Sequence, residues 1–392
     1  MYGTQYIKIM RHLFFHYTRI PLLVEGGTGI GKSEIARNLA RQLQHEWEAM
    51  SKVPATAEQA KALGPVGYTE ANLTACEYAD LVGMPIIVVK EFPDGTKKSV
   101  TDWAPPAWLA ETERFDRGIL LFEEVNRLEL QTRQGYMQLL DTRRIGNVRI
   151  PDGWLIVQTA NPDEEGYHVG SWDKALLRRS AKLLLEGDLR EWQTYGMSAY
   201  DSPIKAGEHI HPKVLAVSTR LGNQGLFEKV DNKAKTKPTY YGLVIVSELM
   251  QSGISELDSE TRMQLMGGII GSDAAQMLET SLSDDNLKRL IEMFRRKESL
   301  KGQNQDVLCD VMFMAVDEAR RDQKAYAEQL QVLWKALPND VKPVLATTCY
   351  PWMLQHREYR TWKLEWREWC QENWDFIMNK GVDPGKTGQE AA

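Results

Sequence analysis

The chain has 392 residues, 43% of them hydrophobic and 26% charged, which suits a soluble globular protein of roughly two to three domains. Its formal net charge of -6 argues against a general nucleic-acid binder, although a local basic pore would be compatible with it. No apolar run approaches the roughly 18 residues that a membrane span needs, so we expect no membrane segment.

The first 20 residues interrupt their apolar positions with His, Arg and Lys, which favours an amphipathic helix over a signal peptide. "IPLLVEG" (20–26) is typical of a buried parallel strand that ends in glycine. The segment after Lys32 has apolar residues at helical spacing. "PIIVVKEFPDGTKKSVTDW" predicts two strands around an Asp94-Gly95 turn.

"GILLFEEV" (118–125) is a second apolar strand, and a helical pattern follows it. "RRIGNVRIP" predicts a small hairpin with Gly146-Asn147 at its tip, and "WLIVQTANP" (154–162) is a third strand. Strands alternating with helices predict an α/β fold with a doubly wound parallel sheet. From about Leu183 the pattern is helical, including one long amphipathic stretch (306–337).

Four cysteines, at positions 76, 309, 349 and 370, match no metal or redox spacing, as expected for reduced thiols in a cytoplasmic protein. The seven histidines form no ligand cluster either, and His209 and His211 read as structural residues of a loop.

One motif carries most of the chemistry: "GGTGIGKS" matches the phosphate-binding pattern G-x-x-x-x-G-K-[ST] between a strand and a helix. Its backbone N–H groups and the helix N-terminus would bind phosphate oxygens, Lys32 would reach the β- and γ-phosphates, and Ser33 would hold Mg²⁺. The candidate nucleotide-binding residues are Gly26, Gly27, Thr28, Gly29, Ile30, Gly31, Lys32 and Ser33.

Two acids end the second strand, where such folds use the first for the magnesium shell and the second for water activation. Glu123 stands where aspartate is usual, and its carboxylate can still serve Mg²⁺. Glu124 is the candidate base. ATP and Mg²⁺ are therefore the expected substrate and cofactor.

"LLFEEVNR", "TANP" (159–162) and "DKALLRRS" (173–180) resemble segments of the MoxR-type AAA+ ATPases, which belong to the helix-2-insert branch of P-loop NTPases. The last segment also resembles that of the McrB and dynein groups. The resemblance covers residues 1–185 and, more weakly, 186–300, and implies an α/β nucleotide-binding domain (1–185, with an insert at about 65–115 and a pre-sensor hairpin at about 143–152) followed by a helical lid (186–300). Beyond the resemblance, the sequence pattern predicts a helical extension (301–379) and a flexible tail (380–392).

The resemblance also implies residue roles. Asn161 would orient the attacking water or sense the γ-phosphate, and Arg178 or Arg179 would reach the site of a neighbouring subunit. Asn126 and Arg127 match the family's "NR" and would either brace the subunit interface or cap a helix.

A second-sensor arginine is expected at the start of "YYGLVIVSELM" (240–250), which begins with tyrosines instead; Arg220 is a substitute by composition only. The aromatic stripe of Tyr359, Trp362, Trp366 and Trp369 suits either packing or a partner surface.

These observations predict an ATP-hydrolysing homo-oligomeric ring, expected to be a hexamer, and the resemblance implies that it remodels a protein client in a chaperone-like way. The resemblance implies a client or partner with a von Willebrand factor A-type domain. The alternatives are a nucleic-acid-acting motor of McrB-like type and a non-hydrolysing nucleotide-binding scaffold.

Overall fold

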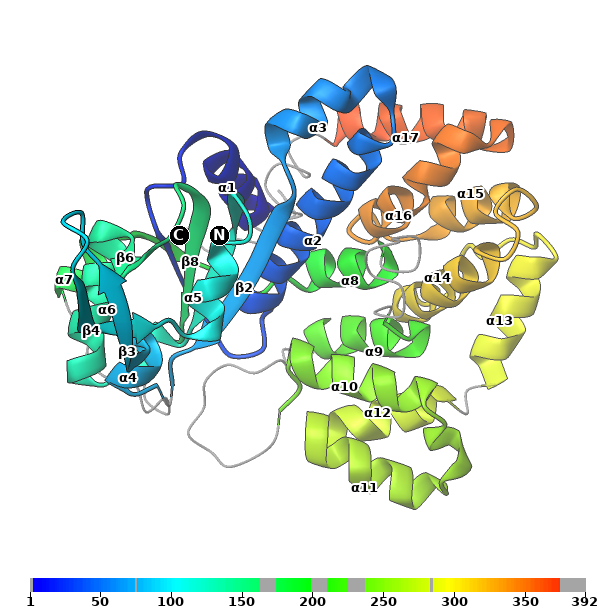
Figure 1. Ribbon diagram of the computed structural model, residues 1–392. Helices are drawn as coiled ribbons and strands as arrows, with labels where there is room; N and C mark the ends of the chain where they lie inside the picture. The colour runs from blue at the N-terminus through cyan, green and yellow to red at the C-terminus, as the bar shows by residue number, and fades with distance from the viewer. Residues whose placement is uncertain are drawn as a thin grey trace, which may run out of the picture. The chain divides into compact units, whose positions relative to one another are not determined.

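A computed structural model of the chain describes residues 3–74, 76–162, 174–198, 210–223, 237–282 and 285–373 (Figure 1). The described residues up to Asp188 form one compact unit, and those from Leu189 onward form a second. The first unit combines strands with helices, whereas every regular element described in the second is helical. The flexible tail predicted at 380–392 lies outside the described residues, as does His209.

Five parallel strands form the central sheet of the first unit, in the order β2-β5-β8-β1-β9. They are β1 (Leu22–Glu25), β2 (Val66–Asn72), β5 (Arg117–Glu123), β8 (Gly153–Ala160) and β9 (Ala181–Leu184). The three strands predicted from apolar runs are the central ones. The edge strands were missed because β2 carries polar residues and β9 is only four residues long.

Alternate strand residues point to opposite faces of the sheet, and both faces are covered. One face packs against α1 (Gly3–His16) and α2 (Lys32–Ser51). The other packs against α5 (Ala107–Thr112) and α6 (Leu130–Thr142). This arrangement confirms the predicted α/β fold with a doubly wound parallel sheet.

Two antiparallel hairpins of the first unit lie outside the sheet, and both were predicted. One pairs β3 (Met84–Glu91) with β4 (Lys97–Ala104), and the other pairs β6 (Arg144–Ile145) with β7 (Val148–Arg149). The remaining elements of this unit are short: 3₁₀ turns η1 (Pro54–Thr56) and η2 (Val125–Arg127), and helices α3 (Ala57–Leu63), α4 (Tyr78–Val82) and α7 (Lys174–Leu177).

Two facing glycines make room for a tryptophan in the sheet. Gly67 and Gly118 are register partners on β2 and β5, and Trp154 is the partner of Gly118 on β8. A Cβ at Gly118 would lie 2.6 Å from both the Gly67 carbonyl oxygen and the Trp154 ring. The buried indole also donates from Nε1 to the Phe115 carbonyl at 2.8 Å. Neither glycine can therefore carry a side chain without moving the ring.

We expect Gly118→Ala to lower the free energy of unfolding by about 1–3 kcal/mol, because the added methyl overpacks a closed core. Thermal denaturation followed by circular dichroism measures the change. Gly268→Ala is the control: a methyl added to that exposed helical glycine would meet no atom within 4 Å, and alanine favours helix by about 0.5–1 kcal/mol. Equal midpoints for Gly118→Ala and the wild type would contradict the packing argument.

A buried arginine fixes the base of the β6–β7 hairpin. Arg143 adopts a left-handed backbone conformation (φ 54°) at the end of α6. Its guanidinium donates to three backbone carbonyls, those of Thr18 (3.1 Å), Pro151 (2.9 Å) and Trp154 (2.6 Å). Burial lowers the pKa of this guanidinium, although the nearby Asp152 opposes the shift. Arg143 thus joins both ends of the hairpin to the segment before β1.

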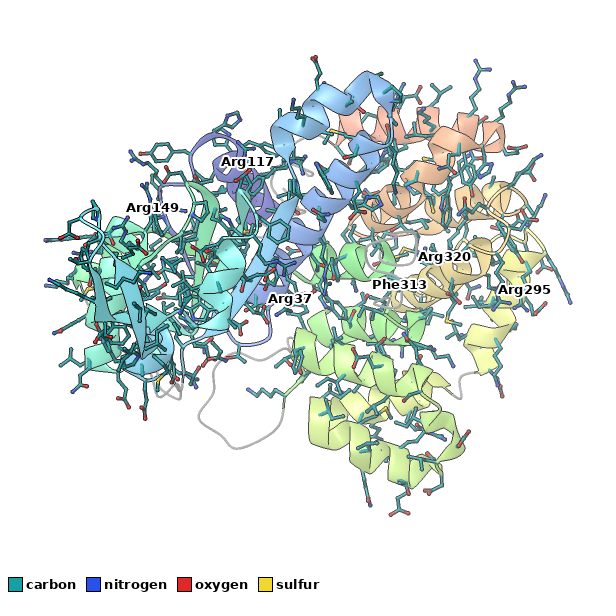
Figure 2. The ribbon with its side chains drawn as sticks, viewed as in Figure 1. Arg37, Arg117, Arg149, Arg295, Phe313 and Arg320 are labelled. Atoms are coloured by element: carbon teal, nitrogen blue, oxygen red, sulfur yellow. The ribbon has the colours of Figure 1, made fainter. Side chains whose placement is uncertain are left out.

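The second unit is a set of helices around one continuous apolar core, in which Phe313 is buried (Figure 2). The helices are α8 (Leu189–Ser198), α9 (Pro212–Asn223), α10 (Tyr240–Gln251), α11 (Ser259–Ile270), α12 (Ser272–Leu282), α13 (Asp285–Arg295), α14 (Gln305–Ala319), α15 (Ala327–Ala336), α16 (Lys342–Gln355) and α17 (Arg360–Glu372), with 3₁₀ turns η4 (Ile254–Glu256) and η5 (Arg357–Tyr359).

The long amphipathic stretch predicted at 306–337 is two helices rather than one. α14 and α15 are separated by a turn in which Asp322 Oδ1 accepts from the Ala325 backbone N–H at 3.1 Å. An aspartate that binds the backbone of a nearby residue competes with helix formation, which explains the break.

The C-terminal aromatic stripe packs into the core of the second unit. Tyr359 and Trp362 have no exposed surface, Trp369 is 8% exposed, and Trp366 packs against the same core while partly exposed. The structure therefore favours packing over a partner surface for this stripe.

Candidate functional site

The phosphate-binding motif forms the loop between β1 and α2. Gly29 and Gly31 have φ values of 76° and 89°, in the left-handed region that favours glycine. Gly26 is constrained differently, because a Cβ there would lie 2.5 Å from the Leu185 carbonyl oxygen. These glycines let the loop turn tightly and present its backbone N–H groups at the start of α2, as a phosphate site requires.

Lys32 folds back over this loop. Its Nζ donates to the carbonyl oxygens of Gly26 and Gly27, both at 2.7 Å, and to Asn161 Oδ1 at 3.0 Å. An ammonium group has three protons, so the three acceptors account for all of them. The lysine predicted to bind phosphates is thus held at the loop with its charge in place.

Burial lowers the pKa of Lys32 to about 8, and the carboxylates of Glu124, Glu123 and Glu25 oppose the shift. Glu25, the last residue of β1, is itself buried and lies 3.0 Å from Lys182 Nζ. A lysine with this pKa is partly neutral in mildly alkaline solution, which makes its protonation sensitive to an anionic ligand.

The shifted pKa predicts that ATP binding takes up a proton. The charge of the phosphates would raise the pKa of Lys32 again, so about half a proton should be taken up per ATP at pH 8 and about a tenth at pH 7. For the same reason, the affinity for ATP should fall as the pH rises above 8.

Calorimetry in buffers of different ionisation enthalpy measures the number of protons taken up on ATP binding. Lys32→Arg is the control, because arginine stays charged; equal uptake in both proteins would contradict the assignment.

The two acids follow each other at the end of β5 but have different surroundings. The Glu123 carboxylate has no hydrogen bond or ion pair within the part of the chain that the structure describes. Glu124 adopts a left-handed conformation (φ 56°, ψ 43°), which ends the strand and begins the turn η2. Glu123 is thus the last residue of the strand, whereas Glu124 is the N-cap residue of the turn.

Asn161 joins Lys32 and Glu124. It follows β8 directly and is 4% exposed, and its side-chain amide faces both groups. Its Oδ1 accepts from Lys32 Nζ, and its Nδ2 donates to Glu124 Oε1 at 3.3 Å. Because β1, β8 and β5 are adjacent in the sheet, three residues far apart in the sequence meet at the carboxyl ends of three neighbouring strands.

The turn η2 supports this arrangement through two residues. Asn126, which is buried, donates from Nδ2 to the Asn161 carbonyl oxygen at 2.8 Å. Arg127 places Nε 3.2 Å from Glu124 Oε2. From the resemblance, these two residues were expected either to brace the subunit interface or to cap a helix. In the structure, Asn126 contacts Asn161 and Arg127 contacts Glu124 within the same chain.

The two arginines after α7 differ in their contacts. Arg179 donates from Nε to Asp141 Oδ1 at 2.8 Å and from Nη1 to the Ala175 carbonyl at 2.8 Å. Arg178 is exposed, and its side chain has no hydrogen bond or ion pair to any residue with a described position. Asp173, which belongs to the same motif, lies outside the described residues. Arg178 therefore remains available for a contact with another molecule, whereas Arg179 is held in its own subunit.

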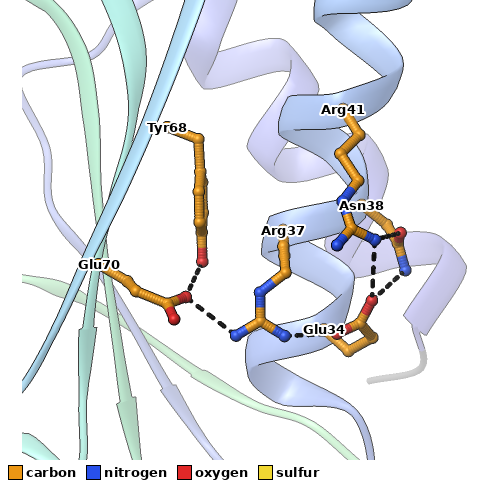
Figure 3. A network of polar contacts seen from close by, with 6 residues as sticks. All are labelled: Glu34, Arg37, Asn38, Arg41, Tyr68 and Glu70. Atoms are coloured by element: carbon orange, nitrogen blue, oxygen red, sulfur yellow. Dashed lines mark hydrogen bonds and ion pairs between the residues drawn. The ribbon is translucent and has the colours of Figure 1, made fainter. Parts of the chain in front are cut away.

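A polar network that the sequence patterns did not predict joins α2 to the edge strand β2 (Figure 3). The Arg37 guanidinium lies between Glu34 Oε2 at 2.5 Å and Glu70 Oε2 at 2.9 Å. Tyr68 also donates to Glu70. Burial alone would raise the pKa of Glu70, but the hydrogen bonds from Tyr68 and Arg37 outweigh it and the pKa is lowered. The network attaches the helix that starts at the phosphate loop to the strand beside β5.

Two basic residues of the hairpins are paired within their own chain. Arg149 on β7 (Figure 2) bonds to Asp152 at 2.9 Å, and Lys97 lies 3.3 Å from Glu91. Arg220, the substitute for a second-sensor arginine, forms an ion pair with the fully buried Asp310 inside the second unit. Arg220 therefore has a structural role, the neutralisation of a buried carboxylate, and this role does not require a nucleotide.

The donor set fits a magnesium ion held jointly with phosphate. Mg²⁺ prefers oxygen ligands and usually takes only one or two protein groups together with substrate phosphates and waters. The Ser33 hydroxyl and the Glu123 carboxylate are oxygen donors without another hydrogen-bond partner among the described residues. Those same residues contain no cluster of three or more His, Cys, Asp or Glu side chains that would hold a metal alone. None of the described helices is both long and apolar enough to cross a membrane.

Comparison with known proteins gives only a distant likeness. No protein-family model matches the chain, and no curated protein matches it. Among solved structures, a mutant of RuvB from Thermotoga maritima has a TM-score of 0.36 and 12% identity, with 84% of this chain and 88% of that chain covered. A putative ATPase from Cytophaga hutchinsonii has a TM-score of 0.34 and 16% identity, with 88% of this chain and 81% of that chain covered. At these values, the likenesses do not establish a family.

Proposed function

We propose that the chain is an ATPase of the AAA+ class and, within it, of MoxR type. The observation that carries the proposal is the continuous contact from Lys32 through Asn161 to Glu124 at the carboxyl ends of β1, β8 and β5. Ligands of open α/β sheets bind at this edge. A phosphate-binding lysine, a polar residue that can orient water and a carboxylate base are the groups that hydrolysis of a phosphoanhydride needs.

In the proposed reaction, the loop amides and Lys32 hold the β- and γ-phosphates. Ser33 and Glu123 hold Mg²⁺, which neutralises phosphate charge when it is bound. Glu124 takes a proton from the attacking water, which Asn161 orients. The water oxygen bonds to the γ-phosphorus as the bond to the β–γ bridging oxygen breaks, giving ADP and inorganic phosphate.

The proposal includes a homo-oligomeric ring in which Arg178 completes the site of the neighbouring subunit. Its support is the contrast between the exposed, unengaged Arg178 and the ion-paired Arg179. An arginine from a neighbour would stabilise charge on the phosphoryl oxygens only after assembly. The MoxR resemblance extends the proposal to a hexamer and to ATP-driven remodelling of a protein client with a von Willebrand factor A-type domain.

The test is ATP hydrolysis per protomer over a range of protein concentrations, with Mg²⁺ present. A site completed by a neighbour predicts a rate per protomer that climbs with concentration and then levels off. A rate that stays near zero at all concentrations, despite ATP binding, would favour the non-hydrolysing scaffold. Stimulation by DNA but not by protein would favour the nucleic-acid motor.

A further inference from the structure

The two oxygens of the Glu124 carboxylate have different partners. Oε2 lies 3.0 Å from Thr74 Oγ1 and 3.2 Å from Arg127 Nε. Oε1 has a single donor within the described residues, Asn161 Nδ2 at 3.3 Å. A carboxylate oxygen has about two lone-pair positions. Oε2 therefore has one hydrogen bond and one ion pair, whereas Oε1 has one hydrogen bond, to Asn161, and no ion pair among the described residues.

This difference decides which oxygen can accept a proton from water. A general base must lie within hydrogen-bond reach of the proton that it removes, with a free lone pair directed at it. Oε1 has the fewer partners, and it shares Asn161 with the phosphate-binding lysine. Because the two carboxylate oxygens are chemically equivalent, a half-turn rotation restores the same arrangement, whereas a partial rotation would move the oxygen beside Asn161 away from it.

Of the two groups that contact Oε2, Arg127 is the one that cannot change to another partner as Thr74 can. The Thr74 hydroxyl has one proton and a second acceptor, Asn72 Oδ1, at 2.6 Å, so it can leave Glu124 for Asn72. Arg127 carries a permanent charge and is held next to Glu124 by the turn, in which its backbone N–H donates to the Glu124 carbonyl at 2.9 Å. Its Nε is shielded from solvent and has no hydrogen-bond partner, so it acts on Glu124 through charge, which a low local dielectric strengthens.

We propose that Arg127 is a positioning residue for the hydrolytic reaction: it holds Oε2 of Glu124 so that Oε1 receives the proton of the attacking water. The inference rests on the proposed ATPase function. In this role, Arg127 acts through Glu124 within its own subunit and not on the reacting atoms directly. Fixing a base within a few tenths of an ångström of its productive position affects the chemical step rather than substrate binding.

The test measures kcat, KM and ATP affinity for Arg127→Gln, Arg127→Lys and the wild type under conditions of full assembly. We expect Arg127→Gln to lower kcat about 10- to 100-fold, with KM and ATP affinity unchanged. Arg127→Lys keeps the charge but lacks Nε, so its kcat should lie between the two. In a Glu124→Gln background, Arg127→Gln should cause no further loss, because the base on which it acts is already gone.

Arg133→Gln is the matched control. Arg133 lies near the start of α6 and donates to the Leu128 carbonyl at 2.9 Å, without a contact to Glu124. It should keep the wild-type kcat, and thermal melting shows whether each variant is folded. Folded Arg127→Gln with a kcat equal to or above that of the wild type, or an equal loss in Arg133→Gln, would overturn the assignment of Arg127. A Glu124→Gln protein as active as the wild type would instead overturn the ATPase proposal itself.

Discussion

Replacement of Arg178 by alanine is expected to lower kcat for ATP hydrolysis by about 10³–10⁵-fold, the effect of removing an arginine that stabilises the transferring phosphoryl group. ATP affinity should change little, because the residue would belong to the neighbour and act mainly in the transition state. Steady-state hydrolysis of the assembled protein, alongside binding of a fluorescent ATP analogue, measures both quantities.

Arg179→Ala is the matched control for this substitution. Its ion pair with Asp141 is partly exposed, and such pairs contribute about 0–1 kcal/mol, so we expect less than about a tenfold change in rate. If Arg179→Ala were the inactive variant and Arg178→Ala the active one, the assignment of the two arginines would be reversed.

Mixing two inactive variants tests whether Arg178 acts between subunits. In a mixed ring, an Arg178→Ala subunit keeps its own Glu124, and a Glu124→Gln neighbour can supply the missing arginine. We therefore expect hydrolysis to reappear in the mixture at a fraction of the wild-type rate. A mixture that assembles and stays inactive would contradict action between subunits.

Glu124→Gln is expected to lower kcat by about 10²–10⁴-fold, because an amide of the same shape cannot accept the proton of the attacking water. ATP binding should be preserved, since the phosphates are held by the loop and Lys32. Single-turnover hydrolysis of bound ATP separates the chemical step from product release.

Glu129→Gln is the control for the loss of one negative charge outside the site. Glu129 is an exposed residue before α6 and makes no side-chain contact within the described residues. It should keep the wild-type rate. Loss of ATP binding in Glu124→Gln, rather than loss of hydrolysis, would show that the carboxylate serves the nucleotide site in another way.

The features that could be predicted from the sequence are those encoded in contiguous residues. The phosphate loop follows from its glycine spacing between a strand and a helix, and the three central strands follow from their apolar runs. The meeting of Lys32, Glu124 and Asn161 was accessible only through the family resemblance. Its geometry depends on the order of the strands, which a single sequence does not encode locally.

The features that escaped prediction depend on partners distant in the chain. Arg178 and Arg179 are alike in sequence, and only Asp141, on another helix, distinguishes them. The need for glycine at positions 67 and 118 depends on the strand register, which places the Trp154 ring against both of them. The edge strand β2 lacks an apolar run, and its polar residues resemble a loop, whereas β9 is only four residues long.

The close approach of Gly26 to Leu185 has a mechanical consequence. The Leu185 backbone N–H donates to the Glu25 carbonyl at 2.7 Å, and its own carbonyl leaves no room for a Cβ at Gly26. The chain leaves the first unit shortly afterwards, at Asp188. Any side chain at position 26 would therefore have to displace the backbone at Leu185, directly after β9. The phosphate loop and the end of the edge strand are in direct backbone contact, and glycine is the residue that permits it.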